Sequence, residues 1–188
     1  MKYAYAPLVG YRSRKAAQAA AKFVCAEGSK IEKLKLIKLM YLAERESIRS
    51  RGRPMFYDEL FSLKDGPICS STLNAINGGI DKEIWAAYIQ KNGDKDIYLV
   101  SGNNGHDELS RSDLAVIESI IRQFGWMTSS QIRNWTHNPR NCPEYTEVEN
   151  NSRLPIAYGD VAVAVGHDDA AAFEASIKEY RHTKALDA

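Results

Sequence analysis

The sequence contains few cysteines, and their arrangement excludes several classes of protein. Three occur in 188 residues, at Cys25, Cys69 and Cys142, and no two of them are close together. An odd number of scattered cysteines provides neither the disulfide framework of a small secreted domain nor the paired spacing of a zinc site. We therefore expect a chain from a reducing cytoplasm that holds no metal and needs no cofactor.

Long hydrophobic runs are also missing. No apolar run approaches the roughly 20 residues that span a bilayer, and the first ten residues contain no continuous apolar segment before Pro7. The sequence therefore predicts a soluble, cytoplasmic protein with no membrane partner.

The chain lacks a surplus of charge of one sign. Lys and Arg total 25 against 24 Asp and Glu, which gives a formal net charge of +1, whereas a dedicated nucleic-acid binder usually carries a large basic excess. Nucleic acid is therefore disfavoured as a partner, although a local basic patch is compatible with this balance. The hydrophobic fraction of 44% is near the average of soluble folded domains, which excludes a disordered chain.

No internal repeat, low-complexity stretch or linker rich in Gly, Ser or Pro divides the chain. A chain of this length can bury roughly two thirds of its unfolded surface in one core. We therefore expect a single domain over residues 1–188, with Lys184–Ala188 as a frayed tail.

Helical periodicity and capping residues predict a domain rich in helix. Apolar residues at the spacing of one helix face indicate a central core helix over about Ile31–Arg51. Lysines precede and follow its start, and the glutamates between them favour a solvated helix face; they are Lys30, Lys33, Lys35 and Lys38. Further helices are expected from Ser13 to Gly28, from Pro67 to Gly78–Gly79, from the capping box Ser110–Asp113 to Gly125, from the second capping box Thr128–Gln131, and over Pro155–Val165 and Asp168–Tyr180.

Few segments have the composition of strands. Met55–Leu63 carries the aromatic residues that strands favour, and Ile97–Val100 is a short strand that can pair with it. The expected fold class is α+β and predominantly α-helical, a single compact helical domain with a small antiparallel β-sheet.

No set of residues has the spacing of a catalytic site. The segment Gly66–Ser70 superficially resembles a nucleophile on a turn, but it lacks the Gly-x-Ser-x-Gly pattern, and Cys69 has the character of a small core residue. The acids of His106–Glu108 and His167–Asp169 precede helices, where the helix dipole favours them. The sequence therefore does not predict an enzyme.

Three alternatives stay open. His137 and Cys142 could form a two-residue metal site, although a hydrogen-bonded structural histidine is favoured. The polar helix within Met127–Arg140 could read bases in a major groove, which keeps a DNA-binding transcriptional regulator as the alternative function. An active site could also be assembled from residues that are far apart in the sequence.

An ordered set of strings resembles the Panacea antitoxin domain, a family that includes SocA-type proteolytic adaptors. The strings are Lys35–Ala43, Gly52-Arg53-Pro54, Ser62–Ser70, Leu109–Asp113 and Thr136-His137. The resemblance extends over about residues 31–165, and the ordered set is more specific than any one string. Departures occur at Leu63, where many members have Trp or Met, and at Ile68, where Val is commoner; both are changes of side-chain volume that leave the fold intact.

The resemblance implies an antitoxin that neutralises a cognate toxin by direct binding, with the toxin encoded by an adjacent gene. Some members instead deliver the toxin to a protease, so a protease is a second implied partner. Because members pair with toxins of very different chemistry, the identity of the toxin is not implied.

We expect the toxin-binding surface around the turn at Gly66 and Pro67. The polar or amphipathic residues that flank this turn should project from it rather than pack beneath it; they are Tyr57, Asp58, Lys64 and Asp65. Gly66 is expected at a position where a side chain is unwelcome. The alternative is an ordinary solvated turn with no partner.

Overall fold

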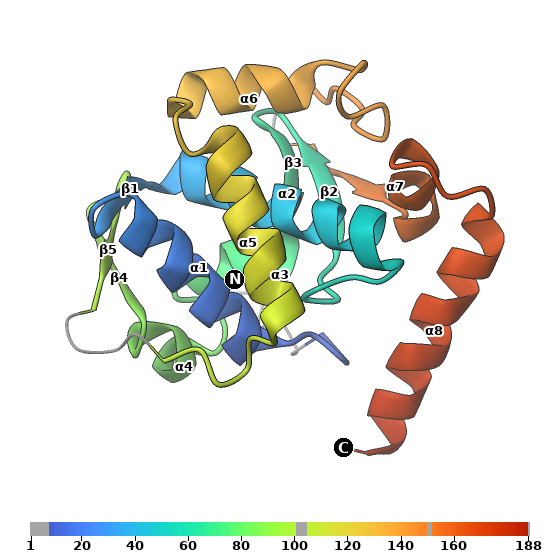
Figure 1. Cartoon of the computed structure of the whole chain (residues 1–188), viewed down its shortest axis with the longest axis horizontal. Coiled ribbons are helices and arrows are strands. Elements are labelled where there is room, and N and C mark those ends of the chain that lie inside the picture. The colour runs from blue at the N-terminus through green and yellow to red at the C-terminus, as the bar shows by residue number, and fades with distance from the viewer. Residues whose placement is uncertain (1–7, 101–104, 150–151, 188) are drawn as a thin grey trace.

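Helices make up most of the structure, a computed structural model that describes residues 8–100, 105–149 and 152–187 (Figure 1). Along these residues it has eight helices and six short strands. The strands form two antiparallel sheets of three strands each. The expected class, a predominantly helical α+β fold with little sheet, is confirmed.

Helix α2 (Lys33–Arg51) lies in the middle of the fold. Helices α1 (Ser13–Ala26), α5 (Arg111–Phe124) and α6 (Ser129–His137) pack against it (Figure 1). The predicted inward face is confirmed, because these residues are buried: Leu36, Leu39, Met40, Ala43 and Ser47. The helix ends at Gly52, whose φ of +64° is the left-handed conformation that glycine adopts readily.

Helix α1 presents an alanine-rich face to the core. Four of its alanines have no exposed surface, and small side chains let the neighbouring backbone approach closely; they are Ala16, Ala17, Ala19 and Ala20. The residue at the N-cap is Arg12, and the helix begins at Ser13 as predicted. The Ser13 hydroxyl accepts a hydrogen bond of 3.1 Å from Trp85, which lies in helix α4 (Lys82–Ala86).

One sheet contains the turn that is the expected contact surface. Strand β2 (Leu60–Leu63) pairs with β3 (Gly66–Cys69) on one side and with β6 (Leu154–Ile156) on the other. Helix α3 (Ser70–Ile76) follows β3 directly. The predicted helix start at Pro67 is therefore wrong, because this residue lies in a strand that is paired with β2.

The second sheet lies on the opposite side of α1 from the first sheet (Figure 1). Its middle strand β5 (Asp96–Leu99) pairs with β1 (Lys30–Glu32) and with β4 (Ile89–Asn92). The predicted pairing between Met55–Leu63 and Ile97–Val100 is wrong, because β1 and β4 already occupy both edges of β5.

Both predicted capping boxes are confirmed. The Ser110 hydroxyl accepts the backbone N–H of Asp113, and the Asp113 carboxylate accepts the backbone N–H of Ser110, at the start of α5. Thr128 and Gln131 make the same reciprocal pair at the start of α6. Each box satisfies two backbone donors that a helix start otherwise leaves unpaired.

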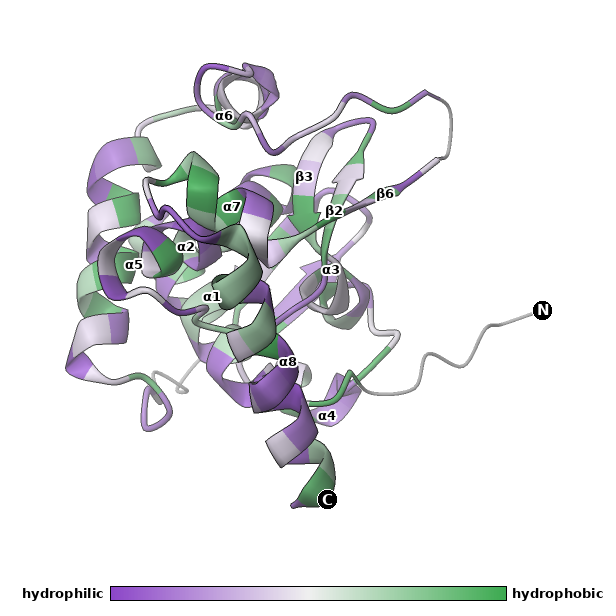
Figure 2. Cartoon of the chain, turned by 90° about the vertical axis from the view of Figure 1, so that its right-hand side faces the viewer, coloured by the Kyte–Doolittle hydropathy of each residue, from purple (hydrophilic) through white to green (hydrophobic). Residues whose placement is uncertain are grey.

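The last two helices are α7 (Tyr158–Ala164) and α8 (Ala170–Leu186). Helix α8 extends along the edge of the molecule (Figure 1), is largely hydrophilic (Figure 2), and buries Phe173 and Ile177. The start of α7 is later than predicted because the preceding residues pair with β2 as strand β6. In the described residues, none of the helices has the length and apolar character needed to cross a membrane.

Helix α8 also continues beyond the point where a frayed tail is expected. Its last turn contains an ion pair of 2.9 Å between Lys184 and Asp187. A cation near the C-terminal end of a helix interacts favourably with the helix dipole. The helix therefore extends to Leu186, whereas Ala188 lies outside the described residues.

Candidate functional site

The turn between β2 and β3 projects Lys64 and Asp65 into solvent. Arg133 of α6 fixes this turn from one side. Its Nε donates to the Asp65 carboxylate at 3.0 Å, and its Nη2 donates to the Lys64 carbonyl oxygen at 3.4 Å. The shape of the turn is thus set by a contact with a neighbouring helix.

Gly66 ends this turn in the left-handed region, with φ of +98°. A Cβ atom added there would lie 2.8 Å from the Nζ atom of Lys38 and 2.8 Å from the Cδ2 atom of His137. Both distances are well inside van der Waals contact. The turn therefore approaches α2 and α6 as closely as it does because residue 66 has no side chain.

An open groove of about 480 Å³ lies between this turn and helices α2 and α3. We call it the turn groove. Its floor is apolar and is formed by Leu34, Ile37, Leu63, Ile68 and Leu73. Three lysines also line it, Lys33, Lys38 and Lys64, together with the Asp65 carboxylate that Arg133 already engages. The groove thus combines an apolar floor with a basic border.

Lys38 is the buried member of these lysines and has no exposed surface. Its Nζ atom donates to the Pro67 carbonyl oxygen at 2.9 Å. Burial lowers the pKa of Lys38 to about 7; the Asp65 carboxylate acts in the opposite direction, and Arg133 adds to the lowering. The charge of this side chain therefore changes near neutral pH.

The predicted solvated face of the lysine-rich helix is wrong for Lys35 and Lys38, which are both buried. The sequence contained a signal for this. Apolar residues surround these lysines at nearly every position from Leu34 to Ala43, and a helix that is apolar on all sides is a buried helix.

Asp58 is fully buried, so the expectation that it projects from the turn is wrong. Its carboxylate accepts the backbone N–H groups of Ser71 at 2.7 Å and Thr72 at 2.8 Å. These donors belong to the first turn of α3, where helical hydrogen bonds are missing. The Asp58 carboxylate is buried because it accepts hydrogen bonds from these backbone N–H groups.

Tyr57 is 8% exposed, so the same expectation is wrong for this residue. Its ring stacks on Tyr180 of α8, with 3.7 Å between the ring centroids. The backbone of Tyr57 adopts φ of +55°, a conformation that is rare for a bulky residue. A toxin-binding role for Tyr57, Asp58, Lys64 and Asp65 stays a prediction, and Lys64 and Asp65 are the two of them that are accessible.

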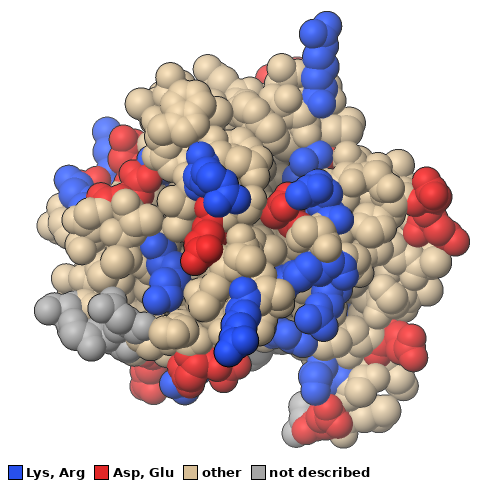
Figure 3. Space-filling model, in the orientation of Figure 1, with Lys and Arg blue, Asp and Glu red and all other residues tan. Residues whose placement is uncertain are grey.

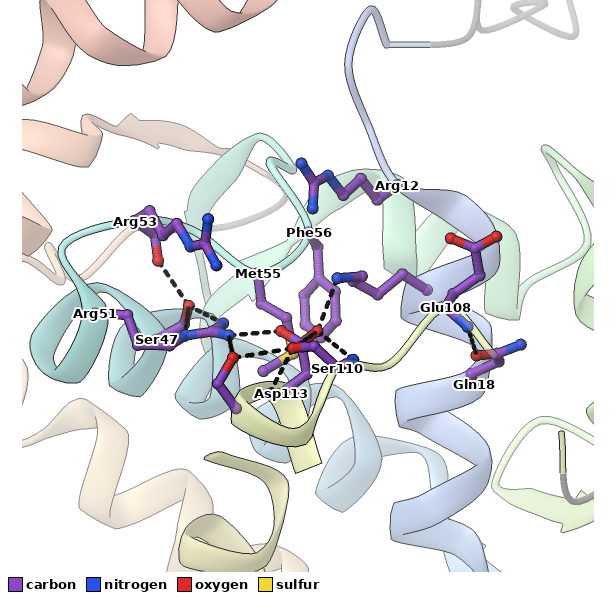
Figure 4. Close-up of polar contacts among 12 residues, drawn as sticks. Arg12, Gln18, Ser47, Arg51, Arg53, Met55, Phe56, Glu108, Ser110 and Asp113 are labelled. Carbon is purple, nitrogen blue, oxygen red and sulfur yellow. Dashed lines mark hydrogen bonds and ion pairs between the residues drawn. The ribbon is translucent and has the colours of Figure 1, made fainter. Parts of the chain in front are cut away.

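A polar network around Asp113 joins three helices (Figure 4). The carboxylate accepts hydrogen bonds from Lys15 at 2.8 Å and from Arg51 at 2.7 Å, in addition to its bond with the N-cap Ser110. Burial disfavours ionisation of this carboxyl, but the bonds from Lys15, Arg51 and Ser110 outweigh it and hold the pKa well below its ordinary value. The network connects α1, α2 and α5, and its central carboxylate is buried.

The thiols of the candidate nucleophile and metal ligand are both shielded. Burial raises the pKa of Cys69 well above its ordinary value and raises the pKa of Cys142 to about 12. A thiol must be deprotonated to attack a substrate or bind a metal strongly. In the described part of the chain, no three His, Cys, Asp or Glu side chains lie together as a metal site. The His137 ring instead lies beside the Tyr145 ring, with 4.7 Å between the ring centroids.

Some of the polar side chains in the helix that could read DNA bases are hydrogen-bonded within the protein, whereas Ser130 and Asn134 are exposed. Thr128 and Gln131 form the capping box of α6, and Arg133 holds the Lys64–Asp65 turn. Base recognition by these groups would require them to give up those bonds.

Comparison with known proteins gives one family. The family model for the SocA-like antitoxin, Panacea domain, matches residues 36–142, more than half of the chain. Searches of curated proteins and of solved structures returned no significant match. The matched residues include most of α2, the whole β2–β3 hairpin, α5 and α6, and most of the turn groove, whose lining residues Lys33, Leu34 and Ser152 lie outside the match. The chain therefore belongs to the SocA-like antitoxin family with a Panacea domain.

Proposed function

We propose that this antitoxin neutralises a cognate toxin, encoded by an adjacent gene, by binding it directly at the turn groove. Membership of the family supports an antitoxin role in general. The observation that carries the proposal for this surface is the apolar groove beside an accessible turn, which lies mostly within the part of the chain that the family shares.

The floor of the groove offers the apolar surface that binding requires. Leu34, Leu63 and Leu73 are half-buried, so a partner side chain in the groove would remove their remaining surface from water. Such burial contributes roughly 25 cal/mol per Å² of apolar area. An apolar centre with a polar border is also the usual anatomy of a protein interface.

Charge at the border of the groove is available to a partner. Lys33 donates to the Asn77 side chain at 3.3 Å, and Lys64 is exposed. Neither lysine forms an ion pair with a carboxylate in the described residues. The groove therefore suits a segment that brings apolar side chains flanked by acidic ones.

Co-expression with the product of the neighbouring gene tests this function. Leu34→Glu combined with Leu73→Glu places two carboxylates on the apolar floor, and both positions are half-buried, so the fold should survive. We expect this variant to lose both rescue of growth and co-purification with the toxin. Leu154→Glu combined with Val163→Glu is the matched control, because these residues are exposed apolar side chains outside the groove.

Two outcomes would contradict the proposal. Rescue and binding by the groove variant at the level of the unmodified protein would remove the groove from the interface. Absence of rescue by the unmodified protein would show that the neighbouring product is not its target.

Delivery of the toxin to a protease is a second mode of neutralisation that the family implies. The lifetime of the toxin in cells separates the two modes. Direct blockade leaves the toxin level unchanged when the antitoxin is present, whereas delivery shortens the lifetime of the toxin and depends on the protease.

A further inference from the structure

Three arginines from separate parts of the chain surround Tyr57. Arg12 precedes α1, Arg53 follows α2, and Arg181 lies in α8. The guanidinium carbon of Arg12 lies 5.1 Å from the centre of the Tyr57 ring, and the positive charge of Arg53 also acts on the Tyr57 hydroxyl. Arg181 donates to the carbonyl oxygen of the next residue, Asp58, at 3.1 Å. We call Arg12, Arg53 and Arg181 the arginine patch.

The side chains of Arg12 and Arg53 extend from opposite sides towards the same region, away from the Asp113 network (Figure 4). Lys15 and Arg51, which lie beside them, are both paired with Asp113. In contrast, the ion pairs of the described residues include none of the three patch arginines. The patch therefore carries positive charge that forms no ion pair with a carboxylate of the described residues.

Two acidic groups near the patch, Glu44 and Asp58, are turned inward, whereas Glu59 is exposed. Glu44 accepts backbone N–H groups of Met55 and Phe56, and Asp58 accepts those at the start of α3. Both carboxylates are fully buried. A group of Lys and Arg side chains lies right of the centre of the face in Figure 3, and Asp and Glu side chains lie along the right-hand edge beyond it. A protein with a net charge of +1 thus carries a locally basic surface.

Arg12 is the member of the patch that is held in position before any partner arrives. Arg12 lies against the stacked rings of Tyr57 and Tyr180, and its Nε donates to the Tyr180 hydroxyl at 3.1 Å. Tyr57 keeps a left-handed backbone that costs free energy and persists only where the surroundings enforce it. An arginine that is already ordered loses less conformational entropy on binding than a free one.

Two of the three arginines lie outside the segment that the family shares. Arg53 is within residues 36–142, whereas Arg12 and Arg181 come from the flanking segments on either side. The patch therefore combines the common domain with parts of this chain that the family model does not match. Such a surface is suited to distinguishing one partner from another.

We propose that the arginine patch is a docking site for an acidic segment of a protein partner, one that presents two or more neighbouring carboxylates. Guanidinium groups bind carboxylates through paired hydrogen bonds. A protein segment is favoured over nucleic acid, because proteins that bind the phosphate backbone make roughly six to ten such contacts and this patch offers three cations. The inference rests on the proposed function in taking the toxin as the partner that carries the segment.

Binding of a fluorescein-labelled octaglutamate peptide to the full chain tests the patch without the toxin. We expect binding at about 50 mM NaCl that is lost at about 500 mM, where charges are strongly screened. Arg12→Gln with Arg53→Gln should weaken binding at least about tenfold. Arg122→Gln with Arg140→Gln is the matched control: it removes the same charge from two exposed arginines elsewhere and should bind as the unmodified protein does.

The single variant Arg53→Gln guards against a loss of fold, because Arg53 is exposed and its side chain makes no hydrogen bond in the described structure. It should melt like the unmodified protein and still weaken binding. Equal binding by the patch variants and the control would overturn the proposal. So would tighter binding of a DNA duplex than of the peptide, if the same arginines were required, because the occupant would then be nucleic acid.

The toxin provides an independent comparison. If the groove variant loses the toxin while the patch variant binds it at the usual strength and salt dependence, the patch is not part of the complex and the inference fails alone. If the unmodified protein binds no toxin but binds the peptide through the patch, the proposed function fails and the acidic docking site stands.

Discussion

Gly66 is the residue on which the geometry of the turn groove depends most directly. It combines a left-handed backbone with the close approach of Lys38 and His137. Gly93 has a similar backbone, with φ of +66°, but nothing lies within 4 Å of the position its Cβ would take. Comparing the same substitution at the two glycines therefore separates the free-energy cost of the backbone conformation from the cost of a steric clash.

We expect Gly66→Val to lower the free energy of unfolding by about 2–5 kcal/mol. A left-handed backbone costs a residue with a side chain roughly 1–2 kcal/mol, and overpacking adds about 1–3 kcal/mol. Gly93→Val should cost only the first amount. Urea unfolding measures both, and equal losses for the two variants would contradict the collision at residue 66.

Lys38 predicts an unusual dependence of stability on pH. Its pKa is about 7 in the folded protein, whereas an unfolded lysine has a pKa near 10.4. Between these values the unfolded chain binds one more proton than the folded chain, so the free energy of unfolding rises with pH, by up to about 1.4 kcal/mol per unit.

The variant Lys38→Met isolates this contribution, because methionine has a similar length and no charge. We expect urea midpoints of the unmodified protein to rise between about pH 7 and pH 10 relative to those of the variant. A constant difference between the two proteins over this range would show that Lys38 keeps an ordinary pKa.

Helix α8 packs against α7, and Tyr180 connects the C-terminal half of α8 to the segment before α1. Tyr180 makes several contacts: it stacks on Tyr57, donates to the Gly10 carbonyl oxygen at 3.0 Å, and accepts from Arg12. A stacked aromatic pair contributes about 0.5–1.5 kcal/mol, and a hydrogen bond about 1 kcal/mol.

Tyr180→Ala should therefore speed amide hydrogen exchange in the last turns of α8 by at least about tenfold. Exchange in α2 should not change. Lys178→Ala, an exposed position on the same helix, is the control. Equal exchange in the two variants would mean that Tyr180 does not hold the helix.

Elements with local signals are the ones that the sequence predicts well. The capping boxes at Ser110 and Thr128 fix the starts of α5 and α6 because all their atoms lie within four residues. Strand partners depend on distant segments, so β6 is not apparent as a strand until it is seen beside β2. The helix expected at Pro67 fails for the same reason, since pairing with β2 decides the conformation of that segment.

The candidate site is predictable only in part at the scale of the whole molecule. The exposed turn at Lys64 and Asp65 follows from a Gly-Pro pair in the sequence. The groove beside it needs Leu34 from α2 and Leu73 from α3, and no local pattern connects these positions. Burial of Tyr57 likewise depends on α8, which lies more than a hundred residues away along the chain.

Charge across the whole molecule shows why a net value is a weak guide to partners. The formal charge is +1, yet Lys33 and Lys64 border the turn groove, and the three guanidinium groups of the arginine patch form no ion pair in the described residues. Many of the acidic groups form ion pairs within the protein, as Glu144 does with Arg45. Sites for anionic partners can therefore exist on a nearly neutral protein.

The contacts that Glu44 and β2 make with the C-terminal part of the chain limit how far the protein can be truncated. The Tyr158 hydroxyl donates to its carboxylate at 2.7 Å, and β6 covers one edge of β2. Both Tyr158 and β6 lie beyond residue 142, where the family match ends. A chain shortened at that boundary would keep every matched residue but leave a strand edge open, and open edges recruit other chains into aggregates. We therefore expect residues 36–142 alone to aggregate, and a soluble monomer to require the chain at least as far as β6 and Tyr158.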